Sequence, residues 1–122
     1  MVERFEELQD KVLEWADSHD LLHEENSEKQ FLKFIEEVFE FKAEFDIGRE
    51  QFIVYTIDKR IKFKPDTRKE MKTEMGDIFV TLIILCKQLG IDPQRCLELA
   101  YEKIKDRKGK TIDGTFVKEE DL

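Results

Sequence analysis

Acidic residues recur at three-residue spacing in two separate segments of the chain. Glu37 and Glu40 lie in "FIEEVFEFKAE", and Glu74 and Asp77 lie in "EMGDIFVTLIILC". Because residues three apart on a helix share one face, each pair can converge on one cation. Carboxylate oxygens without His or Cys suit Mg²⁺ or Mn²⁺ better than zinc. The spacing therefore predicts a divalent-cation site built from four carboxylates on two packed helices.

Asp77 is the most unusual of these acids because the chain around it is strongly apolar. An unpaired ionised carboxylate in a poorly hydrated site costs several kcal/mol, so Asp77 is expected to have a partner. Four converging carboxylates would also raise one another's pKa values unless a divalent cation lay among them. The alternative is two solvated helix faces whose acids bind nothing. Glu36, on the other side of its helix, is interpreted as a surface acid.

Apolar periodicity and capping residues predict four helices, over about 2–18, 28–48, 67–90 and 93–109. The third is apolar nearly all round, so it should be central and contact several helices or another subunit. The type of segment 49–66 stays open between helix and strand, and Asp113-Gly114 gives a weak hairpin signal in the tail. The predicted start and stop signals are Ser27 with Gln30, Gly48, Thr67 with Glu70, Gly90, Asp92 with Pro93, and Gly109.

These elements predict an all-α fold with a four-helix core, in one domain over 1–122 with a short irregular tail from about 109. Apolar residues of the second helix, from Phe31 to Phe45, and Trp15 of the first are expected to face the core. His19 and His23 are interpreted as surface residues rather than zinc ligands. Cys86 and Cys96 are expected to be reduced core thiols.

Composition excludes several classes of partner. The net charge is -8, from 21 Lys and Arg against 29 Asp and Glu, which argues against binding to a nucleic acid polymer or an anionic membrane. The apolar run from Ile78 to Cys86 is far shorter than the roughly 20 residues that span a bilayer. The N-terminal residues are acidic and lack a signal-peptide pattern, so a cytoplasmic location is expected.

Three segments together, "EEVFE" at 36–40, "EMGD" at 74–77 and the later "YEKIKDRKGK", resemble the MazG-like nucleoside triphosphate pyrophosphohydrolases. The signature of that family is EExxE followed by ExxD, and the resemblance runs from about Trp15 to Gly109. It implies the all-α NTP pyrophosphatase fold, in which oligomerisation completes a four-helix core. It also implies Mg²⁺-dependent hydrolysis of (deoxy)nucleoside triphosphates to monophosphate and pyrophosphate, in nucleotide-pool housecleaning.

Carried onto this chain, the resemblance assigns metal binding and catalysis to Glu37, Glu40, Glu74 and Asp77. It assigns substrate phosphates to Lys103 and Arg107, although basic residues at the end of a helix also complement its dipole without any ligand. The connection between the two acidic motifs is longer than in compact family members. A homodimer or homotetramer is expected.

Two other interpretations stay open at the level of sequence. One is a non-catalytic helical dimerisation or interaction module whose acids are structural. The other is a related all-α enzyme, either a dUTPase or a phosphoribosyl-ATP pyrophosphohydrolase.

Overall fold

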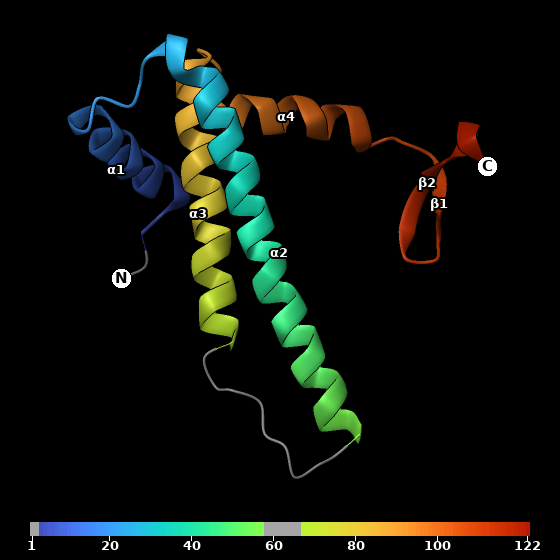
Figure 1. Cartoon of the computed structure of the whole chain (residues 1–122). Helices are drawn as coiled ribbons and strands as arrows, with labels where there is room; N and C mark the ends of the chain where they lie inside the picture. The colour runs from blue at the N-terminus through green and yellow to red at the C-terminus, as the bar shows by residue number, and fades with distance from the viewer. Residues whose placement is uncertain (1–2, 58–66) are drawn as a thin grey trace. The chain divides into compact units, whose positions relative to one another are not determined.

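The computed structural model describes residues 3–57 and 67–122, and these are mainly helical, as predicted. The long elements are α1 (Phe5–Ser18), α2 (Ser27–Ile57), α3 (Thr67–Gln88) and α4 (Pro93–Ile104), followed by strands β1 (Gly109–Ile112) and β2 (Thr115–Lys118) (Figure 1). Two 3-10 turns, Glu24–Asn26 and Glu119–Asp121, precede α2 and follow β2.

The chain forms two compact units, Met1–Gly90 and Ile91–Leu122. The first contains α1, α2 and α3, and the second contains α4 and the β-hairpin. The single domain over 1–122 and the core of four helices therefore stay predictions.

Within the first unit, α2 and α3 pack side by side in antiparallel directions, and α1 packs against α3 (Figure 1). The rings of Phe5 on α1 and Phe79 on α3 meet edge to face, with their centroids 5.7 Å apart. Burial is concentrated on the second half of α3, which confirms its predicted central position. The buried residues there are Thr81, Ile83, Ile84, Leu85, Cys86 and Gln88.

Two glutamine side chains connect this central helix to the rest of the unit. Gln30 on α2 donates from Nε2 to the Thr81 carbonyl oxygen at 3.3 Å, and Gln88 donates from Nε2 to the Leu21 carbonyl oxygen at 2.7 Å. Because both bonds are part-buried and join distant parts of the chain, they position α2 and the segment after α1 on α3.

The predicted end of the second helix at Gly48 is wrong. The helix continues through Gly48 to Ile57, so residues 49–57 of the undecided segment are helical, while 58–66 lie outside the described residues. A glycine inside a helix costs about 1 kcal/mol relative to alanine. The residues that follow it in sequence, Arg49, Glu50 and Gln51, are strong helix formers that offset this cost.

The predicted capping box of Ser27 and Gln30 is also wrong. Ser27 is itself helical, with φ -61° and ψ -34°, because the preceding 3-10 turn leads directly into α2. The Gln30 amide is engaged with Thr81 instead. The other predicted box begins at Thr67, whose side chain lies outside those described.

The predicted end of α3 and the predicted start of α4 are confirmed. Gly90 takes a left-handed φ of +70° just beyond α3, which a glycine adopts without steric cost. The Asp92 side chain accepts a hydrogen bond from the Gln94 backbone N at 3.3 Å, and Pro93 is the first residue of α4.

In the second unit, α4 ends at Ile104 rather than near Gly109, which opens β1 instead. The hairpin suggested by the sequence is present: β1 and β2 are antiparallel, and Gly109 is paired with Lys118. Asp113 and Gly114 form its turn with φ of 50° and 80°, the positive values that type I′ hairpin turns require at both central positions.

Several side chains expected in the core are exposed. Trp15 is 50% exposed and Phe31 is 49% exposed, although the sequence placed both in apolar stripes facing a core. Cys96 is exposed as well, whereas Cys86 is buried as expected. Since α3 is the main neighbour of α2 within this unit, an apolar face as broad as that of α2 is covered only in part.

Candidate metal centre

Three carboxylates from the two facing helices α2 and α3 converge on one another. Glu37 of α2, Glu74 and Asp77 of α3 each offer one oxygen, and these oxygens all lie within 4.8 Å of one another. Glu37 is only 7% exposed, and the other two are half-buried. The three-residue spacing in α3 places Glu74 and Asp77 on one face, and antiparallel packing brings Glu37 against them. The structure therefore brings together three of the four predicted ligands.

Glu40, the fourth, is exposed and lies outside that group, one helical turn beyond Glu37. A hydrogen bond with the Glu37 carboxyl raises the pKa of Glu40, and the negative charges of Glu37 and Glu74 raise it further. Two neighbouring carboxyls can share a proton in this way because both cannot ionise freely at short distance. Glu40 thus borders the group of three carboxylates on its solvent side without belonging to it.

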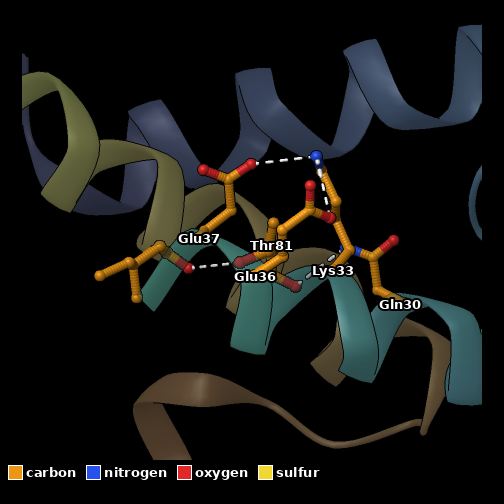
Figure 2. Close-up of polar contacts among 6 residues, drawn as sticks. Gln30, Lys33, Glu36, Glu37 and Thr81 are labelled. Atoms are coloured by element: carbon orange, nitrogen blue, oxygen red, sulfur yellow. Dashed lines mark hydrogen bonds and ion pairs between the residues drawn. The ribbon is translucent and has the colours of Figure 1, made fainter. Parts of the chain in front are cut away.

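Lys33 is a charged partner of the cluster that the sequence reading did not identify. Its Nζ lies 3.2 Å from Glu37 Oε1 and 3.6 Å from Glu36 Oε2 (Figure 2). The hydrogen bond to Glu37 and the charge of Glu36 raise the pKa of Lys33. The signal was present in the sequence, since Lys33 precedes Glu37 by one helical turn. Glu36 is exposed, as expected of a surface acid.

Two carboxylate oxygens of the cluster that Lys33 does not contact are suited to binding a cation. Glu37 Oε2 and Glu74 Oε2 are buried, and neither has a hydrogen-bond donor among the described residues. A buried carboxylate oxygen without a donor is destabilising unless a proton or a cation compensates it. Of these three carboxylates only Glu37 pairs with a lysine among the described residues, so together they form a donor set that can hold a metal ion with hard, oxygen-preferring chemistry.

The predicted phosphate ligands belong to the second unit. Lys103 lies near the end of α4 and Arg107 follows it by one turn, and both line a cavity of about 360 Å³. The structure thus brings Lys103 and Arg107 together with each other. Lys108 and Lys118 line the same cavity, and Lys118 was not predicted because it comes from the hairpin.

The two histidines do not form a metal pair. His19 Nδ1 is 2.8 Å from the Trp15 carbonyl oxygen, and His23 Nε2 pairs with Asp20. Trp15 stacks against His19 with ring centroids 4.6 Å apart and lines an apolar cavity with Leu8, Val12 and Val80.

The chain matches no protein-family model, no curated protein and no solved structure. The resemblance to MazG-like enzymes therefore rests on the acidic motifs and on the basic segment 101–110, which includes the end of α4. Among the helices of the described residues, none has the length and apolar character needed to cross a membrane.

The raised pKa of Glu40 predicts a pH dependence of stability in metal-free protein. The folded state holds this proton more tightly than the unfolded state, whose ordinary value is 4.5, so the contribution is present below pH 4.5 and is lost as pH rises through the raised value. The free energy of unfolding of the wild type should fall across that window relative to Glu40→Gln. Urea titrations between pH 4 and 7 measure the difference, with Glu36→Gln as the control; parallel pH profiles for wild type and Glu40→Gln would contradict it.

Proposed function

We propose that the chain is a Mg²⁺-dependent nucleoside triphosphate pyrophosphohydrolase that acts on cytoplasmic nucleotide pools. The observation that carries this proposal is the convergence of Glu37, Glu74 and Asp77 from two facing helices, with buried carboxylate oxygens that lack donors. It is supported by the order of the motifs in the sequence, EExxE then ExxD then a basic segment.

The proposed roles follow from the chemistry of the donor set. Glu37, Glu74 and Asp77 would hold Mg²⁺, or Mn²⁺ in its place. Once bound, the ion would supply positive charge at the phosphate oxygens and at a water molecule. Lys33 holds Glu37 in position at 3.2 Å and limits the charge that the apo cluster must tolerate.

Glu40 is the carboxyl best suited to exchange a proton with the attacking water. The neighbouring Glu37 carboxyl raises the pKa of Glu40 above its ordinary value, which makes Glu40 a stronger base, and its side chain is exposed, so it can pass a proton to solvent. Lys103 and Arg107 would neutralise the triphosphate, because a guanidinium can bind two phosphate oxygens at once and an ammonium adds a compact charge.

A homodimer or homotetramer belongs to the same proposal. Large apolar side chains on α2 remain exposed within the chain, and a second copy would cover them. These residues are Phe31, Leu32, Val38, Phe39, Phe45 and Ile47. This exposed surface is also the observation that favours the second candidate function, a non-catalytic helical interaction module.

Product analysis distinguishes the two functions. The protein is incubated with a panel of ribo- and deoxyribonucleoside triphosphates, with and without Mg²⁺, and pyrophosphate is resolved from orthophosphate. Metal-dependent release of pyrophosphate and monophosphate is expected, and the rates rank the bases, which also separates a dUTPase from a broader enzyme. Nucleotides that all survive intact would contradict the catalytic proposal and favour the interaction module.

A further inference from the structure

Lys33 contacts the cluster of Glu37, Glu74 and Asp77 through one oxygen of one carboxylate. Its Nζ lies 3.2 Å from Glu37 Oε1 and 3.6 Å from Glu36 Oε2, so two neighbouring acids of α2 hold the ammonium (Figure 2). The other oxygen of Glu37, Oε2, points away from Lys33, is buried and has no hydrogen-bond donor among the described residues. The two oxygens of the Glu37 carboxylate are therefore not equivalent.

The burial of Glu37 distinguishes this ion pair from an ordinary surface pair. Lys42 and Asp46 have the same four-residue spacing on the same helix, but both of their side chains are half-exposed. Glu37 is buried. A buried carboxylate gains more from a neighbouring cation than a solvated one does, because less water competes for it. The contact of Lys33 with Glu37 Oε1 is thus held more strongly than the contact of Lys42 with Asp46.

A carboxylate that has only one oxygen available restricts which cation can bind. Mg²⁺ demands a small octahedral set of ligands and keeps several waters, so one oxygen from each carboxylate is enough for it. Ca²⁺ is larger, takes more oxygen ligands at longer distances and often binds both oxygens of one carboxylate. With Oε1 occupied by Lys33, Glu37 cannot give both oxygens to one ion. The larger ion therefore loses a ligand that the smaller ion does not use.

We propose that Lys33 is a positioning residue that makes the cluster selective for Mg²⁺ over Ca²⁺, because it leaves Glu37 with a single oxygen for the ion. This inference rests on the cation site of the proposed function. It does not rest on turnover, since the selectivity is a property of the metal-binding step alone.

The test is calorimetric titration of the full chain with Mg²⁺ and, separately, with Ca²⁺, at constant ionic strength in KCl and without nucleotide. Lys33→Met keeps an unbranched side chain and removes the ammonium. The ratio of the Kd for Ca²⁺ to the Kd for Mg²⁺ should fall about tenfold in this variant, since residues that orient metal ligands change metal affinity by roughly 10- to 100-fold. Loss of a positive charge alone would strengthen the binding of both divalent ions alike and leave the ratio unchanged.

Lys42→Met is the matched control. It removes the same charge from the same helix, at an ion pair whose acid, Asp46, lies outside the cluster, so the ratio should stay at the wild-type value. Asp77→Asn should lose the binding of both ions, which assigns the titrated site to the cluster. Far-ultraviolet circular dichroism checks that each variant keeps its helices.

An unchanged ratio in Lys33→Met, or an equal fall in Lys42→Met, would overturn the proposal. Wild-type binding in Asp77→Asn would also overturn it, by placing the ion elsewhere. Absence of Mg²⁺ binding by the wild type at millimolar concentration would overturn it together with the cation site. Turnover separates the remaining cases: a fallen ratio without any nucleotide hydrolysis contradicts only the catalytic proposal, and Mg²⁺-dependent hydrolysis with an unchanged ratio contradicts only the role of Lys33.

Discussion

Glu74→Gln and Asp77→Asn should each lower Mg²⁺-dependent pyrophosphate release by at least about 100-fold, because outer partners of metal ligands already cost 10- to 100-fold when removed. Both residues offer an oxygen within 4.8 Å of the other members of the cluster, and the amide variants keep the shape while removing the charge. The measurement is initial rate of pyrophosphate release at saturating nucleotide and Mg²⁺.

Glu36→Gln is the matched control for these variants. Glu36 is an exposed acid next to Glu37 in α2 and lies outside the converging group, so its loss should leave the rate within a few-fold of wild type. Far-ultraviolet circular dichroism checks that every variant keeps its helices. Wild-type rates in Glu74→Gln and Asp77→Asn would remove the cluster from the mechanism, and an equal loss in Glu36→Gln would make the effect non-specific.

Mg²⁺ should raise the melting temperature of the wild type. A ligand that binds only the folded state stabilises it by about 2.7 kcal/mol at a hundred times its Kd, which for a domain of this size corresponds to a rise of roughly 10 °C. The physical reason is that the ion relieves repulsion among three carboxylates, of which only Glu37 pairs with a lysine in the described residues. Differential scanning calorimetry with and without Mg²⁺, at matched ionic strength in KCl, measures this.

Glu74→Gln should melt differently from the wild type, and the direction of the difference should depend on whether Mg²⁺ is present. Without metal the variant should melt at or above the wild-type temperature, because one of the repelling charges is gone. With Mg²⁺ it should show little further rise, because one ligand is gone as well. An equal Mg²⁺ response in both proteins, or none in the wild type at millimolar Mg²⁺, would count against a metal site in this cluster.

Apolar periodicity and capping residues predicted the four helices, and they also predicted where α3 ends and where α4 begins. Gly90 and the Asp92-Pro93 pair act within one turn of the chain, so the sequence alone determines what they do. Gly48 shows the limit of such rules, because a glycine ends a helix only where the following residues stop favouring it. Ser27 shows another limit: its capping role depended on a backbone conformation that the preceding 3-10 turn had already made helical.

The candidate site was predictable only in part. Three-residue spacing determined that Glu74 and Asp77 share a face, but the place of Glu37 against them depends on how two helices pack. That packing separated Glu37, which is buried, from Glu40, which is exposed, although the motif treats them alike. Lys118 was beyond prediction because its position depends on strand pairing with Gly109.

The hydrogen bond from Gln30 to Thr81 has a consequence for the metal ligands at a distance. Glu37 follows Gln30 by seven residues along α2, and Glu74 precedes Thr81 by seven along α3, so both pairs lie at matching levels of two antiparallel helices. Seven residues are about two turns, or roughly 10 Å, and a slip of one residue would shift the helices by about 1.5 Å and turn the facing side chains by about 100°. The hydrogen bond of the Gln30 amide is therefore compatible with only one register of α2 against α3. In that register Glu37 lies opposite Glu74.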